Sequence, residues 1–176
     1  VMDKLIEAGA DVNKAHTKNG MTPLLVAVEG ADLDVMKKLI EAGADVNNAE
    51  LDEDTINLLL FIAAQNGHTL IVEKLIAAGA DVNQARTDDV VTPLHIAAQN
   101  GHTLIVEKLI AADADVNMAT TDGGWTPLFV AAQNGHTNIV SKLISRSALV
   151  DRQAATDGTT PLFMAAQNGH EHVVTK

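Results

Sequence analysis

Cysteine and tyrosine are absent from the 176 residues, and the only aromatic residues are three Phe and one Trp. Without cysteine the chain has no disulfide framework and no thiolate nucleophile. Apolar residues still make up 47% of the sequence, which argues against a disordered chain. Because aromatic rings normally fill the large central volumes of a globule, a core built from Leu, Ile, Val and Ala must be thin.

Basic residues and long apolar runs are also scarce. The 12 Lys and Arg are outnumbered by 23 Asp and Glu, which gives a net charge of −11, and this excess of acid opposes binding to nucleic acid or to an anionic membrane. The longest apolar run, residues 58–64, is far shorter than the roughly 18 residues of a membrane span. The first residues lack the basic and apolar regions of a signal peptide. These features favour an intracellular protein.

Three short motifs recur along the chain in a common register. Asn-Gly-His occurs at residues 66–68, 100–102, 134–136 and 168–170, in steps of 34 residues. Ala-Asp-Val-Asn occurs at 10–13, 44–47, 80–83 and 114–117, and Thr-Pro-Leu begins at residues 22, 92, 126 and 160. Such a fixed period indicates a repeat protein. We therefore predict one array over 1–176, with a partial unit at 1–21, units that start near 22, 58, 92 and 126, and a partial unit from 160.

Each period carries the start and stop signals of two short helices. Thr92 is a good N-cap, and Pro93 suits the first helical position, where an N–H would have no helical partner. Gly101 can adopt the left-handed conformation that ends a helix. Apolar residues at 105, 106, 109 and 110 lie on one face of a second helix. A polar stretch with Gly near its end then indicates a turn or hairpin before the next Thr-Pro.

Helices of this length need packing to persist, so each unit must bury its apolar faces against its neighbours. The alanine pairs, such as Ala97 and Ala98, are small enough to let successive helices approach closely. The sequence therefore predicts a stacked solenoid whose core runs lengthwise.

The motifs at residues 92–98 (Thr-Pro-Leu-His-Ile-Ala-Ala), 101–102 and 114–117 resemble the ankyrin repeat. The resemblance spans essentially the whole chain. It implies an all-α repeat solenoid of helix-turn-helix units joined by β-hairpin loops. It also implies a non-catalytic protein-interaction module that presents hairpin tips and first helices on a concave surface.

Several units depart from the family pattern. The motif His is kept only as His95, so we expect its hydrogen bond to the capping Thr in that unit alone. In the second unit Leu58, Leu59 and Leu60 replace Thr-Pro-Leu, which leaves Thr55 and Asn57 as alternative caps. Residues 30–32 (Gly-Ala-Asp) replace Asn-Gly-His, and we expect the turn between the two helices to be shifted there.

The hairpin tips differ between units, and differences among otherwise similar copies are where recognition of a partner can reside. By the resemblance, the Gln residues at the ends of the first helices line the inner groove. The predicted partner-binding residues are Lys18, Asn19, Met21, Asp54, Asn57, Asp88, Asp89, Val91, Asp122, Trp125, Asp157 and Thr159 at the tips, with Gln65, Gln99 and Gln133. The acids among them predict a protein partner with a basic patch; ordinary solvated turns are the alternative. Trp125 is either an interface hot spot or a cover for the neighbouring hairpin.

The recurring His and Asn residues favour structural roles. Equivalent atoms in stacked helices lie about 8–10 Å apart, too far for neighbouring imidazoles to share a zinc ion. We expect each His to bond loop backbone and each Asn before Gly to satisfy helix carbonyls. No catalytic triad, phosphate-binding loop or metal-binding spacing is present, so neither an enzyme nor a cofactor is predicted.

Two alternative functions and one physical property complete the predictions. The near-identity of the units also fits a structural spacer or an engineered, consensus-like scaffold, and the array is alternatively a targeting segment of a larger protein. Both ends cut through a unit, so apolar residues there are expected to be bare. We therefore expect self-association through these uncapped ends.

Overall fold

The computed structural model describes residues 2–18, 20–30, 32–46, 52–85 and 89–174, and within these ranges the chain forms helices and no strand. The helices are α1 (Met2–Glu7), α2 (Pro23–Glu29), α3 (Leu33–Glu41), α4 (Glu53–Asn66), α5 (Thr69–Ala77), α6 (Pro93–Gln99), α7 (Thr103–Ala111), α8 (Pro127–Gln133), α9 (Thr137–Ser145), α10 (Pro161–Gln167) and α11 (Glu171–Val174).

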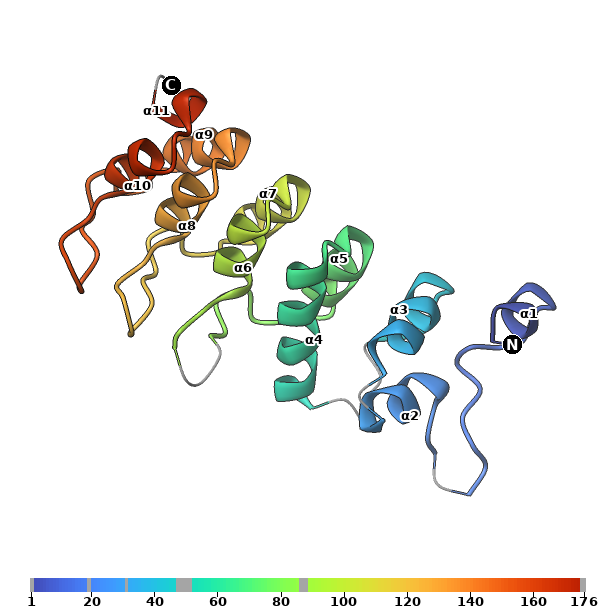
Figure 1. Cartoon of the computed structure of the whole chain (residues 1–176). Coiled ribbons are helices and arrows are strands. Elements are labelled where there is room, and N and C mark those ends of the chain that lie inside the picture. The colour runs from blue at the N-terminus through green and yellow to red at the C-terminus, as the bar shows by residue number, and fades with distance from the viewer. Residues whose placement is uncertain (1, 19, 31, 47–51, 86–88, 175–176) are drawn as a thin grey trace.

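From α2 onward consecutive helices pair, and the pairs follow one another in a row toward the C-terminus, with α1 at the other end of the row (Figure 1). Within the row α4, α6, α8 and α10 form a layer of first helices, and α3, α5, α7, α9 and α11 form a layer of second helices. The loops project from one edge of the row (Figure 1). The predicted all-α solenoid is therefore confirmed.

The core runs along the row and is aliphatic. Its largest fully buried side chains are Leu, Ile and Val residues together with one histidine, His95, and none is aromatic. Ala97 and Ala98 are completely buried between neighbouring helices. Small side chains at these positions explain how a thin core can still reach close packing.

The first helices begin as their sequences predict. Thr92, Thr126 and Thr160 are N-caps, and each is followed by Pro. The Thr92 hydroxyl accepts the backbone N–H of His95 at 3.3 Å, which satisfies one of the donors that a helix start leaves free.

The start of α4 differs from both alternatives that the sequence left open. Asp52 is the N-cap, and its carboxylate accepts the Thr55 N–H at 2.7 Å. Neither Thr55 nor Asn57 caps the helix, which begins at Glu53 and runs for 14 residues. The prediction was wrong because Asp is as good an N-cap as Thr or Asn. Asp52 precedes both candidate residues, so the helix begins earlier than expected.

The turn between α2 and α3 is not shifted, contrary to expectation. Both helices begin and end at positions equivalent to those of α6 and α7. The difference is chemical: Asp32 caps α3 by accepting the Val35 N–H at 3.1 Å, whereas the His102 side chain makes no bond to the start of α7.

The described loops are hairpin-shaped turns closed by backbone bonds. The Thr120 N–H donates to the Trp125 carbonyl at 2.9 Å, and the Gly124 N–H donates to the Thr120 carbonyl at 3.0 Å. Successive loops are also joined, since the Ala155 N–H donates to the Gly123 carbonyl at 2.9 Å. These turns hold the tips in place although no described residue in them belongs to a strand.

Candidate protein-binding surface

A series of histidines joins each unit to the one before it. Nε2 of His102, His136 and His170 lies 3.0, 2.9 and 2.9 Å from the backbone carbonyls of Gln65, Gln99 and Gln133, respectively. A carbonyl can only accept, so Nε2 carries the proton in each case. The predicted structural role, a bond to backbone, is confirmed for these three histidines.

The Asn residues before Gly also satisfy carbonyls at helix ends, as predicted. Nδ2 of Asn100 donates to the Gln65 carbonyl at 2.9 Å, across the junction between two units. Nδ2 of Asn134 instead donates to the Val130 carbonyl of its own helix at 2.8 Å. The Gln backbone is therefore structural, while the side chains of Gln65 and Gln99 are exposed and that of Gln133 is partly exposed.

A second set of asparagines joins the loops, and sequence reasoning did not assign it a role. Oδ1 of Asn83 accepts the Asp115 N–H at 2.7 Å, and its Nδ2 donates to the Asp113 carbonyl at 3.3 Å. Asn13 and Asn117 make the same pair of bonds with the next unit. The recurrence of Ala-Asp-Val-Asn was the available signal for this contact.

Ion pairs join the second helices across units. Nζ of Lys108 lies 2.8 Å from Glu73, and Nζ of Lys142 lies 2.8 Å from Glu107. The bond to Glu73 raises the pKa of Lys108 above its ordinary value. The sequence alone suggested only solvated charges here, because the register between neighbouring helices depends on stacking. These pairs are exposed, so each contributes at most about 1 kcal/mol.

The structure separates the predicted partner-binding residues into groups. Lys18, Asp122 and Asp157 are exposed in the tips. Partly exposed tip residues are Met21, Asp89, Val91 and Thr159. Asn19 and Asp88 lie outside the described residues.

Two residues expected in a hairpin tip lie in α4 instead. Asp54 is exposed in the first turn of the helix. Asn57 is only 6% exposed, and its Oδ1 accepts the Asp81 N–H at 2.8 Å. The expectation was wrong for both residues because the cap at Asp52 draws residues 53–57 into the helix.

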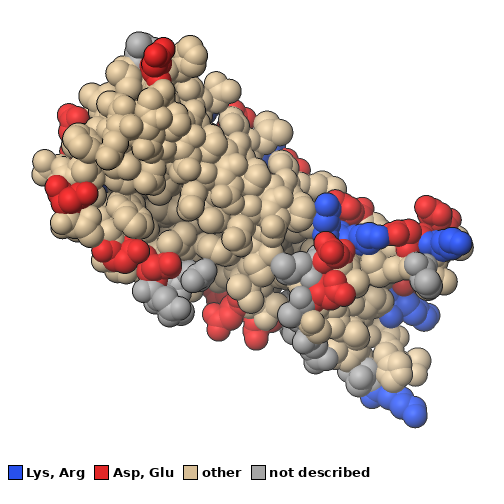
Figure 2. Space-filling model, in the orientation of Figure 1, with Lys and Arg blue, Asp and Glu red and all other residues tan. Residues whose placement is uncertain are grey.

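Charge is unevenly distributed over the face seen in Figure 2. Acidic side chains line much of the edge from which the loops project, and most of the basic side chains in view gather over the α1–α3 end (Figure 2). An acidic edge of this kind attracts a basic partner surface and speeds its approach.

Trp125 packs against its own loop. Its ring stacks on Phe129, with ring centroids 6.3 Å apart, and a Cβ added to Gly123 would overlap the ring. The side chain is still 36% exposed. The ring is therefore held rigidly with one part bare, which is compatible with both interpretations of Trp125 in the sequence.

His95 links its own helix cap to the next loop. Its Nδ1 accepts the Thr92 N–H at 3.2 Å, and its Nε2 lies 3.1 Å from the Trp125 carbonyl. The expected bond to the capping Thr is thus present. Burial lowers the pKa of His95, an effect that its bond to the Trp125 carbonyl partly opposes. The neutral ring suits this position because Nδ1 must accept.

The described ranges hold no cluster of three or more His, Cys, Asp or Glu residues that is arranged to bind a metal ion. No helix within them has both the length and the apolar character needed to cross a membrane.

Comparison with protein families identifies the chain. A family model described as "Ankyrin repeats (3 copies)" matches residues 60–154 and 94–176, and one described as "Ankyrin repeat" matches residues 19–50. The chain belongs to the ankyrin repeat family. Members of this family are generally non-enzymatic protein-interaction modules. Comparison with curated proteins found no significant match.

Proposed function

We propose that the array 1–176 binds a protein partner through the edge formed by its hairpin tips and the neighbouring Gln side chains, without catalysing a reaction. The observation that supports this proposal is that some repeated positions bond neighbouring units, while others leave their side chains exposed. His102, Asn100 and Asn83 are occupied by bonds between units, whereas Asp122, Asp157 and Gln99 are exposed.

The tips are attached firmly enough to serve as a binding surface. The tips at residues 16–21, 120–125 and 154–159 are closed by backbone bonds, and neighbouring tips are joined by the Ala155–Gly123 and Thr121–Asp89 bonds. A surface that is already ordered loses little conformational entropy on binding. The partner would carry a basic patch opposite Asp89, Asp122 and Asp157, and Asn57 is excluded from the surface by its burial.

The acidic edge is tested by neutralising it. Proteins captured from a lysate by the immobilised chain would be compared with those captured by the triple variant Asp89→Asn, Asp122→Asn and Asp157→Asn. A control with the same change in charge, made from exposed acids away from the tips, is Glu7→Gln, Glu41→Gln and Asp151→Asn. We expect loss of capture from the tip variant alone, and the loss should shrink as salt is raised. Equal capture by all three proteins would rule out the acidic edge.

Trp125 provides a second, independent test. With a captured partner in hand, Trp125→Ala should weaken binding by at least about 1 kcal/mol if the ring lies at the energetic centre of the interface. Because the ring also packs on Phe129, the free energy of unfolding of the variant must be measured alongside. A smaller loss of affinity in a folded variant would leave Trp125 with a packing role only.

The near-identity of the units also supports a spacer as a second candidate. The His, Asn and Glu–Lys contacts repeat from unit to unit, as a scaffold would require. A spacer predicts that neutralising the tips changes neither capture nor stability, so the same triple variant distinguishes the two functions.

A further inference from the structure

The three junctions between α4 and α11 share two contacts, and the first two of these junctions share a third. Their first helices stack, as α4 does on α6 and α6 on α8. A His of the later unit bonds a Gln carbonyl of the earlier one. Between second helices, Glu73 pairs with Lys108 and Glu107 with Lys142. Together these contacts couple α4 to α11.

The junction between α2–α3 and α4–α5 lacks the first of these contacts. Within the described parts of both units, α3 packs on α5, but α2 and α4 lack the extensive contact that α4 makes with α6. α2 has the same seven residues as α6 and α8, whereas α4, at 14 residues, is twice as long. The side chains between the units differ as well.

The ion pair is replaced by two like charges. Residues 37–40 (Lys-Lys-Leu-Ile) align with residues 73–76 (Glu-Lys-Leu-Ile), so Lys37 stands where the next units have Glu73 and Glu107. Lys74, whose counterparts Lys108 and Lys142 are each paired with Glu, has no ion pair with any residue in the described ranges. By this alignment Lys37 and Lys74 occupy the two positions of an ion pair, and the repulsion of two like charges weakens a contact between helices.

The histidine bond is missing as well. His68 aligns with His102, but its ring makes no hydrogen bond with any residue that the structure describes, whereas His102 bonds Gln65. Burial and the neighbouring charge of Lys37 both lower the pKa of His68.

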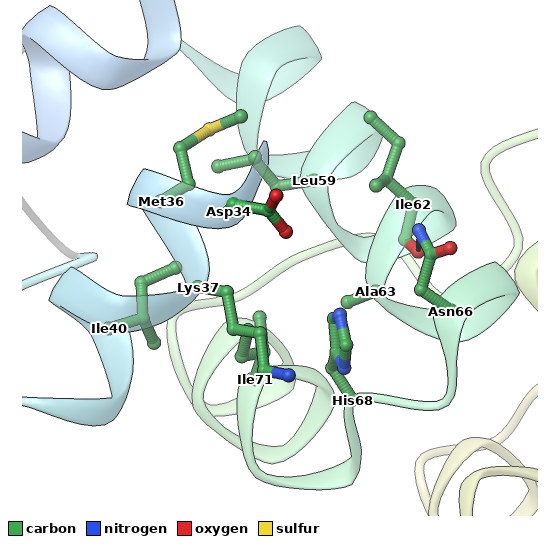
Figure 3. Close-up of a pocket in the computed structure, with 10 residues that line it drawn as sticks. All are labelled: Asp34, Met36, Lys37, Ile40, Leu59, Ile62, Ala63, Asn66, His68 and Ile71. Atoms are coloured by element: carbon green, nitrogen blue, oxygen red, sulfur yellow. Dashed lines mark hydrogen bonds between the residues drawn. The ribbon is translucent and has the colours of Figure 1, made fainter. Parts of the chain in front are cut away.

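An open pocket occupies the same junction. It has a volume of about 300 Å³ and lies between α3 on one side and α4 and α5 on the other (Figure 3). Six of the residues that line it are apolar, and four are polar or charged. The apolar residues are Met36, Ile40, Leu59, Ile62, Ala63 and Ile71, and the others are Asp34, Lys37, Asn66 and His68. Space of this size beside core side chains represents packing contacts that the junction does not make.

We propose that this junction is a joint at which α1–α3 separates from α4–α11 while the latter remains folded. In a solenoid, stability is approximately a sum of unit terms and nearest-neighbour interface terms. One weak interface therefore divides the row into two cooperative blocks. The α1–α3 block keeps its own contacts, since Lys38 pairs with Asp3 at 2.7 Å and Asn13 bonds Asp45 at 2.8 Å. The joint does not depend on whether the tips bind a partner.

Native-state hydrogen exchange in low denaturant tests the joint on the whole chain. Amides of α2 and α3 should exchange at lower denaturant concentration than those of α6 to α9. Fraying from chain ends predicts instead that α10 and α11 lose protection together with α2 and α3. Equal free energies of exchange in α2–α3 and α6–α9 would overturn the proposal, and so would loss of protection that is symmetric at the two ends.

Two variants aimed at the joint decide whether the weakness originates there. Lys37→Glu gives Lys74 a partner like those of Lys108 and Lys142, and should slow exchange in α2 and α3 by about two- to fivefold. Lys37→Gln is its control, because it removes the repulsion without adding a pair, and its effect should be smaller. If Lys37→Glu left the exchange rates of α2 and α3 unchanged, the charges at this junction would not be the cause of its weakness, and the proposal would be contradicted.

Filling the pocket gives an independent measurement. Ala63→Val adds two methyl groups at the pocket wall, whereas the equivalent Ala97→Val adds them to a position that is completely buried. The first substitution should slow exchange in α2 and α3, and the second should destabilise its own unit because overpacking is unfavourable. Destabilisation of the same size by both would show that the pocket is not unfilled space and would count against the joint.

Discussion

The unit of α2 and α3 and the unit of α6 and α7 have the same helix lengths but are attached to their neighbours differently. The His102 ring bonds a carbonyl of the preceding unit, whereas the ring of His68, which lines the pocket beside α3, makes no hydrogen bond with any residue that the structure describes. Glu73 pairs with Lys108, whereas Lys37 and Lys74, which align with that pair, carry like charges. The comparison shows that signals inside a unit shape its helices, while a few side chains between units determine how strongly the units cooperate.

The largest effect is expected at the glycines of the regular junctions. Gly101 has φ of +79°, and a Cβ there would lie 2.8 Å from the His136 ring. Gly79 has φ of +87° and no atom within 4 Å of such a Cβ. Gly79→Ala should cost about 1–2 kcal/mol from backbone strain. Gly101→Ala should cost about 1 kcal/mol more, since the ring must move and its bond to Gln99 is strained. Denaturant unfolding measures both, and equal costs would contradict a tight contact with His136.

A pH dependence should distinguish the unit with His95 from units with Phe in that place. Burial lowers the pKa of His95 below its usual value of about 6.5. The unfolded chain therefore takes up this proton at a higher pH than the folded chain does. The free energy of unfolding should be constant above that pH, fall as the pH drops below about 6.5, and stop falling below the folded-state pKa.

His95→Phe provides the control for this dependence, because Phe61 and Phe129 occupy the equivalent buried positions. The variant should unfold with a shallower slope between pH 7 and pH 5. Part of the slope should remain, since the pKa of His68 is lowered in the same direction. An unchanged slope would mean that His95 does not titrate differently on unfolding.

A smaller effect is expected for the histidines at the junctions themselves. His102→Ala removes the bond to the Gln65 carbonyl and should destabilise the chain by about 1 kcal/mol. His68→Ala has no such bond to lose, although both residues precede a helix in the same way. The two variants would be compared by urea unfolding. Equal losses would show that the histidine bond does not distinguish the two junctions.

The smallest effect concerns the ion pairs between second helices. Glu107→Gln removes the partner of Lys142 and should cost a few tenths of a kcal/mol, because the pair is exposed. The cost should vanish in high salt. Thermal unfolding at low and high salt measures it, and a loss that is independent of salt would point to a role other than charge.

Sequence reasoning succeeded where one residue acts on its own helix. Thr92 and Thr126 cap the helices that they were expected to cap. It failed where two acceptable caps competed, so Asp52 was overlooked and Asn57 was assigned to a tip although it is buried. Sequence reasoning also missed the Glu73–Lys108 pair, because a 34-residue period does not reveal which side chains of stacked helices lie opposite each other.

The period and its motifs by themselves determined that this chain forms short helices that must pack against those of neighbouring units, since no unit holds enough apolar surface to fold alone. The contacts made across each junction were decided only by the tertiary structure. Those contacts depend on distances of a few ångströms between residues about 35 positions apart, such as the 3.0 Å between His102 and Gln65. Local propensity carries no information about such distances, and for that reason the weak junction beside His68 became visible only in the folded chain.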